Sequence, residues 1–124
     1  MGYQFVKKQV YVNEQKIFYL EGGTASKSEP ILFLHGWGVG IQPYQEVLNV
    51  LCKRYQVIAP ELPGFNKSSG SKLNWDYDNY AKCIIAFMQR LNIKKAHFIG
   101  HSLGGGIAAT IAALMPDFVK SLIL

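Results

Sequence analysis

The sequence predicts an α/β fold, in which a mostly parallel sheet is flanked by helices. Short, continuously apolar runs alternate along the chain with longer segments whose apolar residues recur at helical spacing. The short runs lack polar alternation, as expected of central strands that helices cover on both faces. A chain of 124 residues with 49% hydrophobic content is also long enough to form one domain with its own core.

Each expected element follows from the local pattern. We expect strands at 4–12, 16–20, 31–34, 57–59, 96–99 and 119–124. The first helix should present an inner face of Tyr44, Val47, Leu48, Leu51 and Tyr55. The second, capped by Asp76 or Asp78, should present Tyr80, Ile84, Phe87, Met88 and Leu91. The third should cover 103–115 and end before Pro116.

The most informative motif is Gly-His-Ser-Leu-Gly at 100–104, between an expected strand and an expected helix. A G-x-S-x-G at such a junction is typical of a nucleophile elbow, a sharp turn that exposes a serine hydroxyl. The turn strains the serine backbone and leaves little room beside it, which explains glycine at Gly100 and Gly104. Ser102 is therefore the candidate nucleophile.

Two further loops follow apolar runs in a recognisable order. His35-Gly36-Trp37-Gly38 comes after the run at 31–34, and Pro60-Glu61-Leu62-Pro63-Gly64-Phe65 comes after the run at 57–59. With Gly100-His101-Ser102-Leu103-Gly104-Gly105, these motifs resemble those of the α/β-hydrolase superfamily. The resemblance covers roughly residues 16–124 and is nearest to the serine esterase-like branch. Glu61 stands where that family more often has Asp, and Asn66 where it often has Gly.

The resemblance implies how a developing oxyanion would be stabilised. Its two donors would be the backbone N–H groups of Trp37 and Leu103. The Leu103 N–H also opens a helix, where amides lack intrahelical acceptors and the dipole favours an anion. Gly36 and Gly38 would let the first loop approach closely. Four residues would support the elbow and this loop: His35, His101, Gly100 and Gly104. The Trp37 side chain would either line the acyl pocket or simply pack.

A serine nucleophile needs a base, usually a histidine oriented by a carboxylate. His97 precedes Ser102 by five strand residues, which is about 16 Å. The side chain of His101 should diverge from its neighbour on a sharp turn, and His35 belongs to the oxyanion loop. The resemblance implies a base after an eighth strand and an acid after a seventh or sixth, all beyond Leu124. The carboxylates for which we expect only capping or surface roles include Asp76, Asp78 and Asp117.

The chain stops in an apolar strand, which would leave an unpaired hydrophobic edge. We therefore expect residues 1–124 to be the N-terminal part of a single α/β-hydrolase domain, truncated after about six strands. The missing C-terminal half would be needed in cis or in trans.

Composition restricts the partners. The 13 basic and 8 acidic residues give a net charge of +5, but the basic residues are scattered, so no nucleic-acid partner is expected. The chain has neither an apolar signal core at its start nor an apolar run that could span a bilayer, and we expect a soluble, cytoplasmic protein. Cys52 and Cys83 lack metal-ligand spacing and read as buried thiols. No metal and no cofactor are expected.

The function expected of the complete protein is hydrolysis of a small-molecule carboxylic ester or thioester through an acyl-serine intermediate. One alternative is a non-catalytic or partner-dependent module that keeps the fold without a triad. A less favoured alternative is a dinucleotide-binding domain, because Gly36, Gly38 and Gly40 follow a strand. That reading requires a third glycine where Ile41 stands, and it leaves the elbow unexplained.

Overall fold

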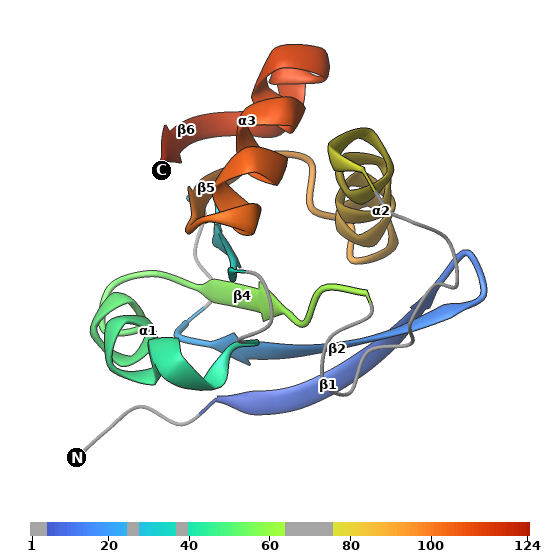
Figure 1. Ribbon diagram of the computed structural model, residues 1–124. Helices are drawn as coiled ribbons and strands as arrows, with labels where there is room; N and C mark the ends of the chain where they lie inside the picture. The colour runs from blue at the N-terminus through green and yellow to red at the C-terminus, as the bar shows by residue number, and fades with distance from the viewer. Residues whose placement is uncertain (1–4, 25–27, 37–39, 64–75) are drawn as a thin grey trace.

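A computed structural model describes residues 5–24, 28–36, 40–63 and 76–124, and it confirms the α/β fold (Figure 1). The strands are β1 (Val6–Val12), β2 (Gln15–Gly22), β3 (Ile31–Leu34), β4 (Val57–Pro60), β5 (Ala96–Gly100) and β6 (Val119–Ile123). The helices are α1 (Gln45–Leu51), α2 (Tyr77–Arg90) and α3 (Leu103–Leu114), with short 3-10 turns η1 (Gln42–Tyr44) and η2 (Pro116–Phe118).

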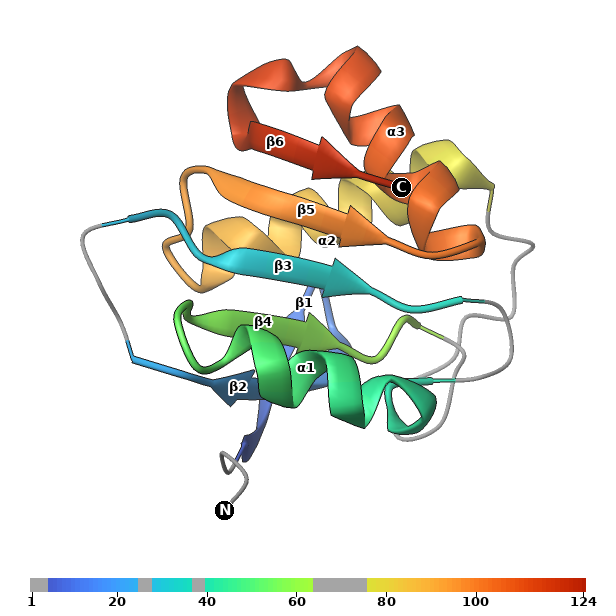
Figure 2. The same ribbon diagram turned by 90° about the vertical axis from the view of Figure 1, so that its left-hand side faces the viewer.

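The six strands form one sheet in the order β1-β2-β4-β3-β5-β6. β4, β3, β5 and β6 run parallel, whereas β1 and β2 form an antiparallel hairpin and β2 pairs antiparallel with β4 (Figure 2). The hairpin turn places Asn13 and Glu14 at φ values of 49° and 68°. Tight hairpins favour this left-handed backbone because it matches the strand twist. The mostly parallel sheet is thus confirmed, with an antiparallel edge.

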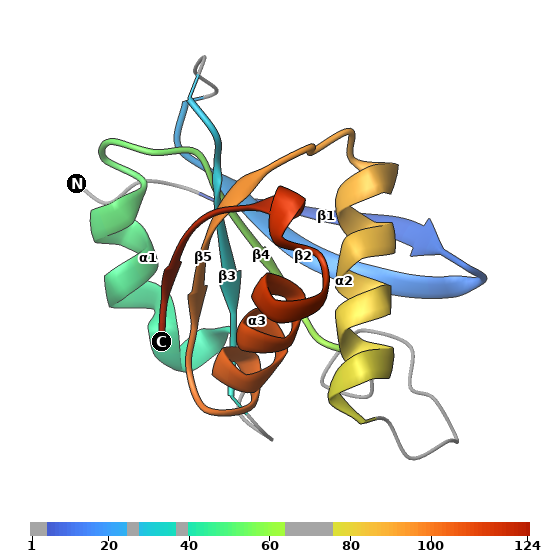
Figure 3. The ribbon, with the colours of Figure 1, turned by 90° about the horizontal axis from the view of Figure 1, so that it is seen from above.

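Helices cover both faces of the sheet (Figure 3). α1 packs on one face over a small core that includes Ile31, Phe33 and Leu48. α2 and α3 pack on the other face over the larger core, which includes Phe87 and Phe98. The continuously apolar strand β3 is buried along its whole length, as expected of a strand between two helical layers.

The predicted inner face of the second helix is confirmed, but that of the first is wrong in part. Tyr80, Ile84, Phe87 and Met88 are buried in α2, and Leu91 packs against the same core. In the first helix Leu48 is buried, whereas Val47 and Tyr55 are 50% and 45% exposed. The helical periodicity extrapolated from Tyr44 fails because Tyr44 lies in η1, which has about three residues per turn, and α1 ends at Leu51.

Asp76 rather than Asp78 caps α2. The Asp76 Oδ1 accepts a hydrogen bond of 2.8 Å from the Asn79 N–H, while Asp78 lies in the first turn, where the helix dipole favours an acid. α3 ends at Leu114 and Pro116 opens η2, as the sequence indicates.

The parallel direction of β3, β4 and β5 brings three loop starts to one edge of the sheet. The segments that begin at His35, Glu61 and His101 all leave the carboxyl ends of neighbouring strands. Open α/β sheets bind their ligands at this edge.

α3 comes unusually close to this edge at Gly104. A Cβ atom on Gly104 would overlap the backbone carbonyl of Leu34, whereas a Cβ on Gly105 would lie 3.3 Å from its nearest neighbour, the Gly100 oxygen. The absence of a side chain at residue 104 therefore allows the helix to approach β3.

We predict that Gly104→Ala lowers the free energy of unfolding by about 2 kcal/mol or more, because backbone atoms cannot yield to the added methyl group. Gly105→Ala is the matched control, where a gain in helix propensity of about 1 kcal/mol offsets a tight contact. Urea unfolding of both variants measures the difference. Equal stabilities would contradict the close approach.

Candidate active site

Ser102 has a strained backbone at the junction between β5 and α3. Its φ and ψ angles are 57° and −116°, a combination that L-residues rarely adopt. Such a conformation costs on the order of 1–3 kcal/mol and persists only where the surroundings enforce it. The Ser102 side chain is exposed, and α3 begins at the next residue. This geometry is that of a nucleophile elbow.

Backbone hydrogen bonds and close packing hold the elbow in place. The His101 N–H donates to the Leu34 carbonyl at 3.1 Å, which ties the turn to β3. The Gly104 N–H donates to the His101 carbonyl at 3.0 Å, and the Gly106 N–H to the Ser102 carbonyl at 3.1 Å. A Cβ on Gly100 would overlap the Gly104 carbonyl. The surrounding structure therefore fixes the turn tightly enough to maintain the strain.

The loop after β3 begins against the elbow. A Cβ on Gly36 would lie 3.3 Å from the Ser102 Cβ and 3.3 Å from the His101 Nδ1. The remaining loop positions singled out by the sequence, Trp37 and Gly38, lie outside the described residues. Leu103 is the first residue of α3, so its N–H belongs to the group that lacks an intrahelical acceptor. The structure thus places the start of one expected donor loop and the other expected donor beside Ser102.

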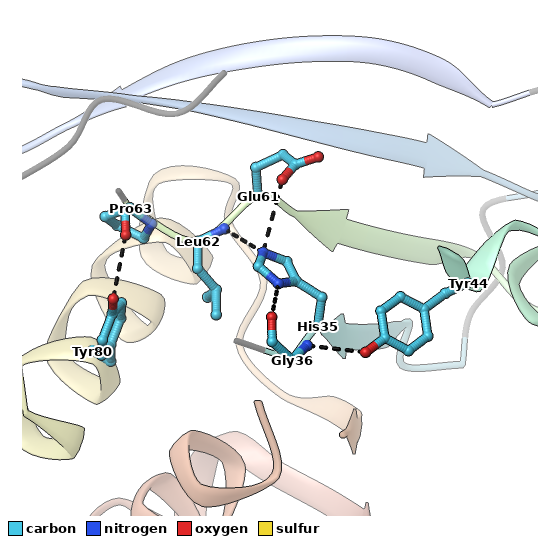
Figure 4. A network of polar contacts seen from close by, with 7 residues as sticks. All are labelled: His35, Gly36, Tyr44, Glu61, Leu62, Pro63 and Tyr80. Atoms are coloured by element: carbon cyan, nitrogen blue, oxygen red, sulfur yellow. Dashed lines mark hydrogen bonds and ion pairs between the residues drawn. The ribbon is translucent and has the colours of Figure 1, made fainter. Parts of the chain in front are cut away.

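His35 joins two loops at this edge (Figure 4). Its side chain is fully buried, with Nδ1 2.7 Å from the Gly36 carbonyl oxygen and Nε2 2.9 Å from the Leu62 nitrogen. A carbonyl only accepts and an amide only donates, so the proton is on Nδ1 and Nε2 accepts. Burial lowers the pKa of His35, although the Glu61 carboxylate, 3.8 Å from Nε2, acts in the opposite direction. His35 is therefore a neutral connector between the loops after β3 and β4.

Tyr44 makes a second connection, which the sequence analysis did not find. Its hydroxyl accepts a hydrogen bond of 3.1 Å from the Gly36 N–H (Figure 4). The same hydroxyl lies 2.8 Å from the His101 Nδ1. In the sequence Tyr44 appears only as one apolar position of a helix. No local pattern could have indicated a contact to His101, which is 57 residues away.

The three histidines all have ring nitrogens engaged with other groups. His35 contacts Gly36 and Leu62, His101 contacts Tyr44, and the Nδ1 of His97 lies 2.6 Å from the Ser121 hydroxyl on the neighbouring strand β6. The carboxylates Asp76 and Asp117 lie at the start of α2 and in η2.

The structure describes Cys52 and Cys83 as buried free thiols. Burial raises the pKa of Cys52 to about 11 and that of Cys83 to about 12, so both stay protonated at neutral pH.

Within the described ranges, no group of three or more His, Cys, Asp or Glu side chains could hold a metal ion. In the same part of the chain, no helix combines the length and the apolar character that crossing a membrane requires.

Comparison with known proteins identifies one family for most of this chain. A sequence model of the alpha/beta hydrolase fold matches residues 29–124. The chain is 35% identical over 104 residues to the dihydrolipoyllysine-residue acetyltransferase component of the acetoin cleaving system of Pseudomonas putida, covering 84% of this chain and 27% of the relative. It is 32% identical to a 2-hydroxy-6-oxo-6-phenylhexa-2,4-dienoate hydrolase of Burkholderia cepacia, covering 94% of this chain and 43% of the relative.

The fold of the chain also matches that of a solved structure. A bacterial membrane phospholipase A superposes with a TM-score of 0.89 at 34% identity, covering 95% of this chain and 38% of the phospholipase. The chain therefore spans less than half the length of each of these three proteins.

We predict that the free energy of unfolding falls as the pH falls below 6.5, the ordinary pKa of histidine. Below that value the unfolded chain takes up a proton that buried His35 resists until its own lowered pKa is reached. The contribution of His35 to the free energy of unfolding is therefore complete above pH 6.5. Below that pH, this contribution falls by no more than about 1.4 kcal/mol per pH unit.

The matched variant is His35→Gln, measured by urea unfolding between pH 5 and 8. The free energy of unfolding of this variant should be about 1–3 kcal/mol lower than that of the wild type at pH 7.5, because the Gly36 carbonyl and the Leu62 N–H lose their partner. Its free energy of unfolding should also depend less steeply on pH. An unchanged slope would show that His35 does not titrate as its burial implies.

Proposed function

This chain belongs to the alpha/beta hydrolase fold family, and on that premise we propose that it supplies the nucleophile and the oxyanion-binding part of a serine hydrolase. The proposed substrate is a carboxylic ester or thioester of a small molecule. The single observation that carries the proposal is the strained, exposed Ser102 between β5 and α3, with Gly36 packed against it.

The chemistry proceeds in two steps. The Ser102 Oγ attacks the carbonyl carbon, its proton passes to a general base, and the carbonyl oxygen becomes an oxyanion. The N–H of Leu103 and, in this proposal, that of Trp37 stabilise this charge. The intermediate then collapses, the base protonates the leaving alcohol or thiol, and an acyl-serine remains. Water, deprotonated by the same base, attacks the acyl group, releases the acid and restores the serine.

His35 and Tyr44 support this role because they hold Gly36, the first residue of the proposed oxyanion loop. The Gly36 carbonyl accepts from His35, and its N–H donates to Tyr44. A peptide group is planar, so in this proposal fixing the carbonyl of Gly36 also orients the amide that follows it.

We assign the general base and its carboxylate partner to a segment outside residues 1–124, acting in cis or in trans. The engagement of His35, His97 and His101 with other groups supports this assignment. We also propose a cytoplasmic location, where Cys52 and Cys83 would remain reduced.

A second candidate substrate follows from the relative in Burkholderia cepacia, which is named for a 6-oxo-dienoate. In this second proposal, Ser102 attacks the oxo carbonyl of the dienoate, and the same N–H donors stabilise the oxyanion that forms. Comparing p-nitrophenyl esters with an oxo-dienoate as substrates separates the two candidates.

We predict that Ser102→Ala lowers the turnover of p-nitrophenyl esters by about 10³-fold or more, because the covalent step is lost. The assay uses the protein joined to the segment that supplies the base, with circular dichroism as the control for folding. Residues 1–124 alone should hydrolyse these esters only weakly.

Two outcomes would contradict the mechanism. One is full esterase activity in Ser102→Ala. The other is loss of wild-type activity on addition of a chelator, since the proposed steps require no metal ion.

A further inference from the structure

The Tyr44 hydroxyl connects two segments that are far apart in the sequence and meet at the nucleophile. On one side it accepts the Gly36 N–H at 3.1 Å, and on the other it lies 2.8 Å from the His101 Nδ1. Gly36 begins the loop after β3, and His101 directly precedes Ser102. One oxygen atom thus contacts both parts of the proposed site.

We propose that Tyr44 is a positioning residue for hydrolysis at Ser102. Its hydroxyl fixes the distance between the oxyanion loop and the elbow, and it holds the His101 ring in one tautomer. This inference rests on the proposed serine hydrolase function, which it extends to a residue outside the sequence motifs.

The Tyr44 side chain is well held for this task. Its ring packs against Phe33 on β3, with centroids 4.8 Å apart and an interplanar angle of 60°. It also meets the His101 ring edge-on, with centroids 5.7 Å apart. A tyrosine has only two side-chain torsions, so a packed ring places its hydroxyl accurately at little cost in entropy.

The available protons fix one hydrogen-bond direction at this hydroxyl, and the proposal assigns the other. The Gly36 amide can only donate, so the hydroxyl oxygen accepts there. We assign the hydroxyl proton to the bond with the His101 Nδ1, 2.8 Å away, so that in this proposal Nδ1 accepts and the ring proton is on Nε2. Because the His101 backbone N–H is also bonded to the Leu34 carbonyl at 3.1 Å, both the main chain and the side chain of His101 are fixed.

The expected effect is on the transition state rather than on binding. Oxyanion donors must lie about 2.7–3.1 Å from the developing charge, and a displacement of about 1 Å can cost about 100-fold in rate. Gly36 keeps its second anchor, the bond from His35, so loss of the Tyr44 bond should loosen Gly36 without releasing it.

The test compares Tyr44→Phe with Tyr80→Phe in the ester-hydrolysing protein. Tyr80 is a matched control, because its hydroxyl also bonds one loop of this edge, donating to the Pro63 carbonyl at 3.3 Å, but it approaches from α2 (Figure 4). We expect Tyr44→Phe to lower kcat about tenfold with KM changed less than about twofold, and Tyr80→Phe to change each by less than about twofold. Equal effects of the two substitutions on kcat would overturn the proposal.

A spectroscopic readout tests the contact without any substrate. Nitrogen-15 NMR of the His101 ring should show the proton on Nε2 in the wild-type protein and a mixture of tautomers in Tyr44→Phe. The same tautomer population in both proteins would overturn the proposed hydrogen bond.

The proposed serine hydrolase function and the proposed role of Tyr44 can be disproved separately. If hydrolysis persists in Ser102→Ala, the proposed function fails, whatever Tyr44 does. If hydrolysis depends on Ser102 but kcat is unchanged in Tyr44→Phe, only the role of Tyr44 is overturned.

Discussion

The strained backbone of Ser102 is the constraint on which the rest of this structure depends. A residue at a φ of 57° and a ψ of −116° would relax unless its neighbours prevented it. The neighbours that prevent it are β3, which accepts the His101 N–H, and α3, which comes close enough to close the turn. The buried glycine at residue 104 makes that approach possible. The parallel sheet and the helix packed on it thus hold one hydroxyl in an exposed, well-defined position.

A second set of contacts joins the described starts of the loops around that hydroxyl. Buried His35 connects the loop after β3 to Leu62 after β4, and Tyr44 connects the same loop to the elbow. These bonds are short-range, but they join three segments that only the strand order brings together. Because buried polar groups are costly when unpaired, each connection favours one arrangement of these loop starts over others. The described part of the candidate site is therefore held together at the strand ends.

The sequence predicted the parts of this architecture that depend on local pattern. The boundaries of β3 and the start of α3 agree with the apolar runs, and the buried face of α2 agrees with the spacing of Tyr80, Ile84 and Phe87. It could not predict which of Asp76 and Asp78 caps α2, since both side chains can accept the same bond. The phase of α1 was mispredicted at Val47 because a 3-10 turn precedes the helix. The contact between Tyr44 and His101 depends on strand order, which no local spacing encodes.

The most direct test of the central claim is the site of covalent labelling by a fluorophosphonate in protein that hydrolyses esters, mapped by mass spectrometry. Ser121 provides an internal comparison, because its hydroxyl lies 2.6 Å from a histidine ring nitrogen but its backbone lies in strand β6 rather than in a positive-φ turn. We expect a single adduct, on the peptide that contains Ser102. An adduct on Ser121, or undiminished hydrolysis by protein that carries no adduct on Ser102, would contradict it.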